Sequence, residues 1–143
     1  MEEGIRRIRE VFGIEIEEAA QYSPLVLAYI GDAVYETVIR SLALSEGNRQ
    51  VEKLHRYSAG FVRASAQADL GRYLLPLMSE EEADIYRRGR NAHSHTVAKN
   101  ASIGDYRHAT GFEALIGYLY LKGEERRALE LIRIGLEGLE KKS

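Results

Sequence analysis

The sequence contains no cysteine, which excludes both a disulfide framework and a thiolate metal site. It also has no signal-peptide pattern at its start and no apolar run long enough to cross a bilayer. These absences favour a cytoplasmic protein with no membrane attachment. No obvious linker divides the chain, and its 143 residues suffice for one domain with a hydrophobic core, residues 1–143.

The net charge of −2 does not suggest a nucleic-acid partner, but the charge is unevenly distributed. Residues 87–107 hold five Lys or Arg and one acid, a net +4, which leaves −6 for the rest of the chain. The cations are Arg87, Arg88, Arg90, Lys99 and Arg107, and His93 and His95 are weaker candidate donors. Such donors can neutralise phosphates, although a solvated surface loop would explain the same run. The His-x-His spacing could bind zinc, but no third ligand follows at a recognisable spacing.

The apolar spacing predicts an all-α fold, because apolar residues recur at three and four positions. A Ser-Pro pair predicts a helix from 23 to about 45, ending at a glycine. Further helices are expected over about 48–57, 59–75 and 79–90, the last with a capping box between Ser79 and Glu82. Residues 91–106 lack a sustained period and are expected to form a long loop, followed by helices over about 105–123 and 124–142.

Asp32 interrupts an apolar run, "LVLAYIGDAVYETV", that contains no Lys or Arg. A carboxylate there needs a partner from elsewhere in the chain, a metal ion or water. The simplest interpretation is a solvent-facing polar stripe with an ion pair between Glu36 and Arg40. Gly31 argues against it, because glycine inside a helix lowers helix propensity and often permits another group to approach closely.

Glu113 is the only charged residue in the stretch "ATGFEALIGYLYL", and its neighbours one helical turn away offer no opposite charge. A helix that is apolar all round is buried, so this carboxylate should have a raised pKa and should cost stability unless a cation lies opposite it. A core glutamate bonded to a tyrosine or to backbone remains an alternative. If Asp32 and Glu113 meet across the core, they could ligate Mg²⁺ for phosphodiester cleavage.

Two segments together carry a resemblance to a known family. "LAYIGDAVYE" at 27–36 and "FEALIGYLYL" at 112–121 resemble the two signature segments of ribonuclease III endonuclease domains. The intervening "RRGRNAHSHTVAKNASIGDYRHATGFEALIG" is similar to Mini-III ribonucleases, the minimal bacterial branch of that family. Members of this branch lack the appended double-stranded-RNA-binding domain, and this chain has no room for one.

The resemblance implies the all-α ribonuclease III endonuclease fold, a homodimer, and Mg²⁺-dependent cleavage of double-stranded RNA, with Mn²⁺ as a substitute metal. Asp32 and Glu113 match the signature acids and would be catalytic metal ligands. Tyr29 matches an aromatic residue that inserts into the partner subunit. The implied substrate is precursor 23S ribosomal RNA, recognised with help from a bound large-subunit ribosomal protein.

Two acids of larger ribonucleases III are missing, because Ala28 and Thr110 occupy their positions. Either water and phosphate oxygens complete the metal shell, or Glu36 or Asp105 substitutes, and Glu36 is the preferred auxiliary ligand. The missing acids also motivate an alternative function, a non-catalytic RNA-binding or ribosome-assembly module on a degenerate ribonuclease III fold. A purely structural helical interaction protein is a third interpretation.

Overall fold

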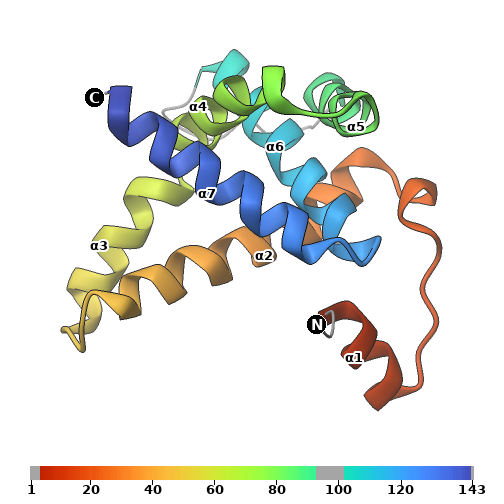
Figure 1. The fold of residues 1–143 in the computed structure, drawn as a ribbon, viewed down its shortest axis with the longest axis horizontal. Helices are drawn as coiled ribbons and strands as arrows, with labels where there is room; N and C mark the ends of the chain where they lie inside the picture. The colour runs from red at the N-terminus through yellow and green to blue at the C-terminus, as the bar shows by residue number, and fades with distance from the viewer. Residues whose placement is uncertain (1–3, 93–101, 143) are drawn as a thin grey trace.

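A computed structural model describes residues 4–92 and 102–142, and the regular structure in these ranges is entirely helical (Figure 1). The predicted all-α fold is therefore confirmed. The helices are α1 (Gly4–Phe12), α2 (Pro24–Ser45), α3 (Val51–Val62), α4 (Ala64–Leu74), α5 (Glu80–Asn91), α6 (Ile103–Leu121) and α7 (Glu125–Lys142), with 3₁₀ segments η1 (Ala19–Gln21) and η2 (Leu75–Leu77).

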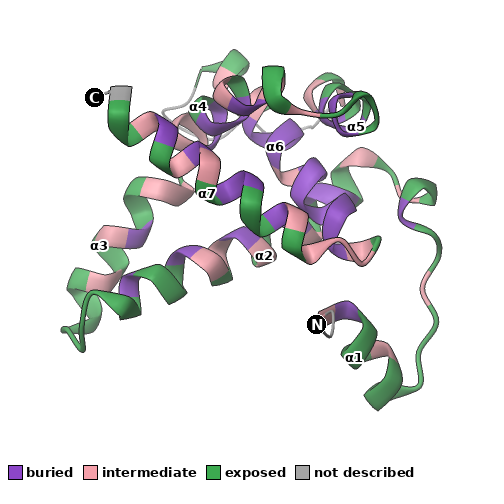
Figure 2. Cartoon of the chain, in the orientation of Figure 1, coloured by how far each residue is buried: buried purple, intermediate pink, exposed green. Residues whose placement is uncertain are grey.

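Helix α6 is the central element, and α2, α4, α5 and α7 all pack against it. Residues 109–112 and 114–120 are buried, so α6 is enclosed on nearly every side (Figure 2). This confirms the interpretation of its continuous apolar sequence as a buried helix. Glu113, between the two buried runs, is half-buried.

Several helix ends lie where the local sequence predicts them. The Ser23 hydroxyl accepts a hydrogen bond from the Val26 amide, and Pro24 is the first residue of α2. The capping box at the start of α5 has both of its bonds, between Ser79 and Glu82. Helix α2 ends just before Gly47, which has φ of +125°, a conformation that favours glycine.

The predicted boundary between α3 and α4 is wrong. The break lies at Arg63, whose backbone is extended, rather than near residue 58. Two tertiary hydrogen bonds satisfy the last carbonyls of α3, from Tyr35 Oη to Phe61 O at 2.8 Å and from Gln67 Nε2 to Val62 O at 2.7 Å. These bonds depend on neighbouring helices and have no local sequence signal.

Two helix starts also differ from prediction. Helix α3 begins at Val51 with Gln50 as its N-cap, instead of near residue 48. Helix α6 begins at Ile103, because the Ser102 hydroxyl accepts a hydrogen bond from the Asp105 amide at 3.0 Å. The predicted loop of 91–106 is therefore shorter at both ends, since α5 includes Asn91.

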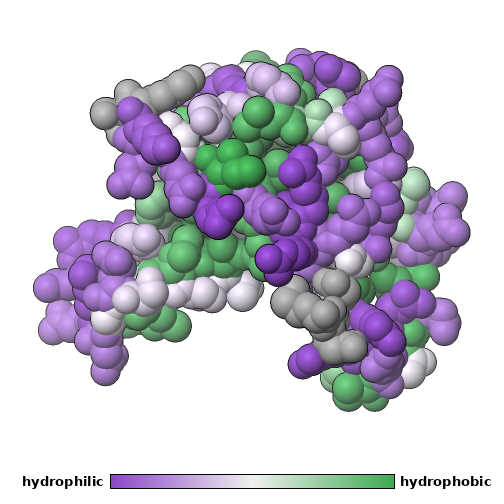
Figure 3. Space-filling model, in the orientation of Figure 1, coloured by the Kyte–Doolittle hydropathy of each residue, from purple (hydrophilic) through white to green (hydrophobic). Residues whose placement is uncertain are grey.

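Hydrophilic side chains cover most of the face drawn in Figure 3, with hydrophobic ones exposed between them. Within the described ranges, no helix combines the length and the apolar character that crossing a membrane requires.

Candidate active site

The candidate site forms where α2 crosses α6. A Cβ atom added to Gly31 would overlap the carbonyl oxygen of Glu113, and one added to Gly117 would overlap the carbonyl oxygen of Leu27. The two backbones are therefore in direct contact at this crossing, which only glycine permits. The sequence signal at Gly31, a glycine inside an apolar helix, is explained by this approach.

The crossing brings Asp32 within hydrogen-bonding reach of Glu113. Asp32 is exposed on α2, whereas Glu113 is half-buried on α6, so the pair connects the core to the surface. Burial is the largest cause that raises the pKa of Glu113 to about 8, followed by the hydrogen bond with Asp32 and the charge of Asp32. Two carboxyl groups can share a hydrogen bond only while one of them is protonated.

Gln67 is a third polar side chain that affects the Glu113 carboxyl, and no sequence pattern predicted it. It lies on α4, which packs against α6, and it lowers the pKa of the Glu113 carboxyl, opposing the larger effects of burial and Asp32. Among the described residues, the side chains that shift the pKa of Glu113 are thus one anion and one neutral amide, and no cation.

The two acids considered as substitute ligands, Glu36 and Asp105, both form ion pairs with arginines. Glu36 forms the ion pair with Arg40 that the simplest interpretation predicted, at 3.1 Å between Oε1 and Nη2. Asp105 pairs with Arg72 at 2.9 Å. In the part of the chain that the structure describes, no three His, Asp or Glu side chains gather closely enough to hold a metal ion. A role for Glu36 as an auxiliary ligand remains a prediction.

The Asp32–Glu113 pair nevertheless fits a magnesium ion. Mg²⁺ commonly binds one or two protein carboxylates and keeps several waters, so two adjacent carboxylates with one open to solvent are a suitable donor set. The positions of the two missing family acids add no ligand: Ala28 is buried, and the Thr110 hydroxyl donates to the Tyr106 carbonyl oxygen at 3.0 Å.

Of the cations predicted to contact RNA, those that the structure describes lie on α5 and α6, which pack against each other. Arg87 and Arg88 are exposed at the end of α5, Arg107 is exposed near the start of α6, and Arg90 is half-buried. Gly89 lies against Gly111 where these two helices touch. His93, His95 and Lys99 lie outside the described residues.

A histidine that the sequence analysis did not assign lies between these helices. His108 Nδ1 and Tyr86 Oη are 2.5 Å apart, and burial is the main cause that lowers the pKa of His108. Nearby Arg72 and Arg90 act in the same direction. This pair therefore joins α5 to α6.

Tyr29 is 81% exposed on α2, one helical turn before the carboxylate pair. Leu25 and Val26, also on α2, are exposed as well. Large apolar side chains grouped on a surface are typical of an interaction site.

Comparison with known proteins identifies the family. The Ribonuclease III domain matches residues 25–124, which include both carboxylates and the whole α2–α6 crossing. A Mini-ribonuclease 3 of Clostridium tetani is 48% identical over 89% of this chain and 85% of its own length. A Mini-ribonuclease 3 of Brevibacillus brevis is 49% identical over 78% of this chain and 83% of its own length.

A solved structure agrees with these relatives. The crystal structure of a protein from Fusobacterium nucleatum superposes with a TM-score of 0.77 at 30% identity, covering 86% of this chain and 98% of the other. The chain therefore belongs to the ribonuclease III family, in its Mini-ribonuclease 3 branch. This membership confirms the resemblance seen in the sequence and supports a ribonuclease III-type endoribonuclease.

Proposed function

We propose that this protein is a metal-dependent endoribonuclease that hydrolyses phosphodiester bonds in double-stranded RNA, with Asp32 and Glu113 as its metal ligands. The observation that carries the proposal is the carboxylate pair at the α2–α6 crossing, because no cation in the part of the chain that the structure describes contributes to the pKa of Glu113. Mg²⁺, or Mn²⁺ in its place, would supply a Lewis acid and an activated water when bound.

The protein's own groups have separate tasks in this proposal. The backbone of Glu113 lies at the close contact between α2 and α6, while Asp32 is exposed to solvent, where a phosphate can approach. Arg87, Arg88 and Arg107 expose cationic side chains for RNA phosphates, and Arg90, His93, His95 and Lys99 are proposed to extend this set. A-form RNA is recognised mainly by shape, phosphates and 2′-hydroxyls, so such a surface needs no base-reading motif.

The test is a cleavage assay on a long RNA duplex, with and without Mg²⁺, for the native chain and for Asp32→Ala. Cleavage that requires both the metal and Asp32 is the expected result. Cleavage that persists in Asp32→Ala would place the active site elsewhere. Circular dichroism of both proteins checks that the substitution leaves the helical fold intact.

The second candidate is an RNA-binding module without catalysis, favoured by the absence of acids at Ala28 and Thr110. Duplex binding that weakens steeply with salt is expected of both RNA functions. Tight binding without cleavage under Mg²⁺ or Mn²⁺ would support the binding module. Affinity that does not depend on salt or RNA form would contradict both.

Exposed Tyr29 supports a homodimer, in which this ring packs against the second subunit. Sedimentation of Tyr29→Asp should then show a shift from dimer to monomer, whereas an unchanged dimer would remove Tyr29 from the interface. Precursor 23S ribosomal RNA, presented in the cytoplasm with a large-subunit ribosomal protein, is the natural substrate that we carry forward from the family resemblance.

A further inference from the structure

Helix α1 carries an apolar stripe that the protein covers only at its beginning. Ile5, Ile8 and Phe12 follow one another at helical spacing, and their exposed fractions rise from 9% to 43% and 73%. Val11, beside Phe12 in the sequence, is exposed as well. Figure 1 shows α1 standing apart from the other helices. The far half of this helix therefore presents large apolar side chains to water.

A groove of about 520 Å³ begins where α1 meets the other helices. A Cβ atom added to Gly4, the first residue of α1, would lie 3.2 Å from Glu125 Oε2 and 3.3 Å from Tyr120 Cε1. Both of these residues line the groove, and Leu129 of α7 and several residues of α2 form its other sides. Among the described residues that line it, Glu125 is the only charged one, so the groove is mostly apolar.

The groove continues into the exposed apolar patch at the start of α2. Ile30 and Ala33 line the groove, and they follow Val26 and Tyr29 by one helical turn, so that the four side chains share one stripe of α2. Apolar surface therefore extends from Tyr29 across the groove to the base of α1. Grouped apolar side chains of this extent are typical of an interface with another protein.

The charge around α1 does not suit a polyanion. Residues 4–18 hold three arginines and four glutamates, so this part of the chain has no cationic excess. Arg6 pairs with Glu10 at 3.2 Å. Arg9 pairs with Glu15 at 3.4 Å. Binding to RNA or to an anionic membrane surface depends on an excess of cations. The exposed side of α1 therefore suits a protein partner better than either of these.

The protein partner that this surface fits best is a second copy of the chain. Members of the ribonuclease III family typically act as dimers, and Tyr29, at one end of the surface, is proposed to contact the second subunit. In a two-fold dimer every contact occurs twice. A helix as short as α1 therefore adds two apolar contacts to a single interface.

We propose that the second copy covers the exposed end of α1 together with the groove between α2 and α7, so that α1 is an arm of the dimer interface. The inference extends the proposed homodimer and rests on it. Helix α1 lies outside residues 25–124, which the Ribonuclease III domain matches. The contact is thus additional to those that the domain itself can make.

The experiment measures the dimer dissociation constant by sedimentation equilibrium for the full native chain, Phe12→Glu, Leu129→Glu and Leu77→Glu. A carboxylate at either of the first two positions would be buried in the interface without a partner, and it should weaken the dimer at least about 10-fold. Leu77 provides the matched control, because it is also an exposed leucine but lies on η2, between α4 and α5 and away from α1 (Figure 1). Leu77→Glu should dimerise like the native chain. Circular dichroism reports the folding of each variant, and Val11→Glu repeats the test on α1.

The outcomes separate the arm from the homodimer. Unchanged dimerisation of folded Phe12→Glu and Val11→Glu, with dissociation of Tyr29→Asp, would overturn the role of α1 and leave the homodimer intact. Equal weakening by Leu77→Glu would overturn it too, because the loss would not be specific to this surface. So would unchanged dimerisation of these variants together with loss of native binding to phosphatidylserine vesicles, which would assign α1 to a membrane surface. A native chain that stays monomeric would contradict the homodimer and the inference with it, whereas the RNA cleavage assay tests the endonuclease separately.

Discussion

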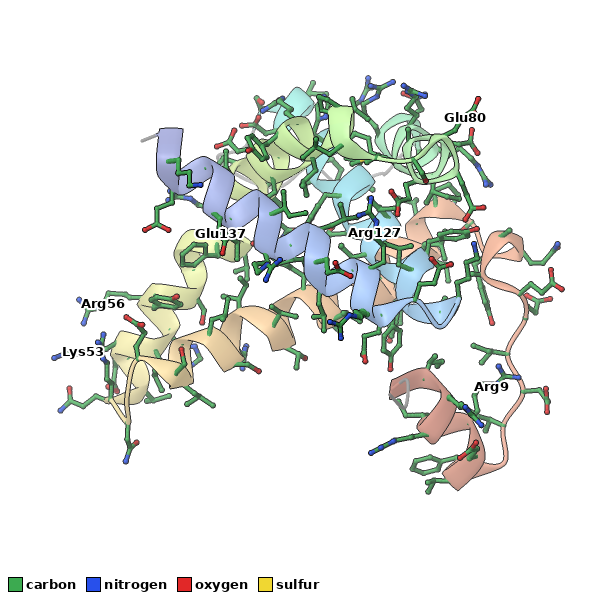
Figure 4. All side chains as sticks on the ribbon, viewed as in Figure 1. Arg9, Lys53, Arg56, Glu80, Arg127 and Glu137 are labelled. Carbon is green, nitrogen blue, oxygen red and sulfur yellow. The ribbon has the colours of Figure 1, made fainter. Side chains whose placement is uncertain are left out.

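Two glutamates in the core of this protein have opposite surroundings. Glu82, on α5, is 5% exposed and accepts hydrogen bonds from Arg127 Nε and Nη2 at 2.8 and 2.9 Å. The hydrogen bond with Arg127, which extends from α7 (Figure 4), is the largest cause that lowers the pKa of Glu82. Glu113, on α6, meets Asp32 instead, and its pKa is raised to about 8, mainly by burial.

The difference separates a structural carboxylate from a functional one. A bidentate arginine and a capping box satisfy Glu82, so its charge links α5 to α7 through the ion pair with Arg127. Among the described residues, no arginine or lysine pairs with Glu113, and Asp32, a second acid, acts on it instead. An ionisable group with a strongly shifted pKa and no opposite charge beside it is a functional-site candidate. A carboxylate paired with an arginine is adequately explained by the fold.

The largest contrast should appear in cleavage of duplex RNA. Glu113→Gln should abolish Mg²⁺-dependent cleavage, because it removes one of the two proposed metal ligands, whereas Glu82→Gln should retain cleavage per folded molecule. A gel-based cleavage assay at matched concentrations of folded protein measures both. The comparison fails if the two variants lose activity equally.

The next effect is on the crossing that brings the carboxylates together. Gly31→Ala should lower the free energy of unfolding by roughly 1–3 kcal/mol, since the added methyl group overlaps the α6 backbone. Gly60→Ala is the matched control, because no atom lies within 4 Å of the Cβ it would add on α3. That variant should be stabilised by up to about 1 kcal/mol. Urea denaturation measures the stability of both variants. Equal changes for Gly31→Ala and Gly60→Ala would refute the close contact between α2 and α6.

Arg127→Met should destabilise the protein by about 1–3 kcal/mol, because buried Glu82 loses its bidentate partner. Arg126→Met is the control on the same helix, since Arg126 pairs with Glu130 on the surface and its side chain is 77% exposed. The control should change stability by less than about 1 kcal/mol. Denaturation midpoints at pH 7 measure both changes. Equal losses of stability would show that the Glu82–Arg127 pair contributes no more than an exposed ion pair.

A further expected effect is a pH dependence of stability in metal-free buffer. The folded state holds a proton on Glu113 up to a pKa of about 8, above that of the unfolded chain. The free energy of unfolding should therefore fall as pH rises through that window, by at most about 1.4 kcal/mol per pH unit. Glu82 acts in the opposite sense: its pKa is lowered in the folded state, so its contribution is lost at acid pH. Denaturation of the native chain and Glu113→Gln at pH 5 and pH 8 isolates the Glu113 contribution, and identical slopes would contradict it.

Much of the fold follows from local sequence. Ser23 with Pro24, the capping box at Ser79 and the glycine at 47 fix helix ends through contacts within one or two turns. The α3–α4 break could not be predicted, because Tyr35 and Gln67 hold the end of α3 from other helices. Local helix propensity does not predict hydrogen bonds between helices.

The candidate site was predictable in part. Isolated charges in apolar runs indicated Asp32 and Glu113, and Gly31 indicated the close approach that joins them. Gln67 was missed, although a polar residue three positions before Leu70, on the buried side of α4, is a usable signal. Its importance depends on the packing of α4 against α6, which a single sequence does not specify.

The most direct test of the account is the pKa of the Glu113 carboxyl group, measured by carbon-13 NMR without metal and then with Mg²⁺, in the native chain and in Asp32→Asn. The account predicts a pKa near 8 in the metal-free native chain, a lower pKa in Asp32→Asn, and a fall on adding Mg²⁺ that depends on Asp32. An ordinary glutamate pKa in the native chain, unchanged by Mg²⁺ or by the loss of the Asp32 charge, would contradict it.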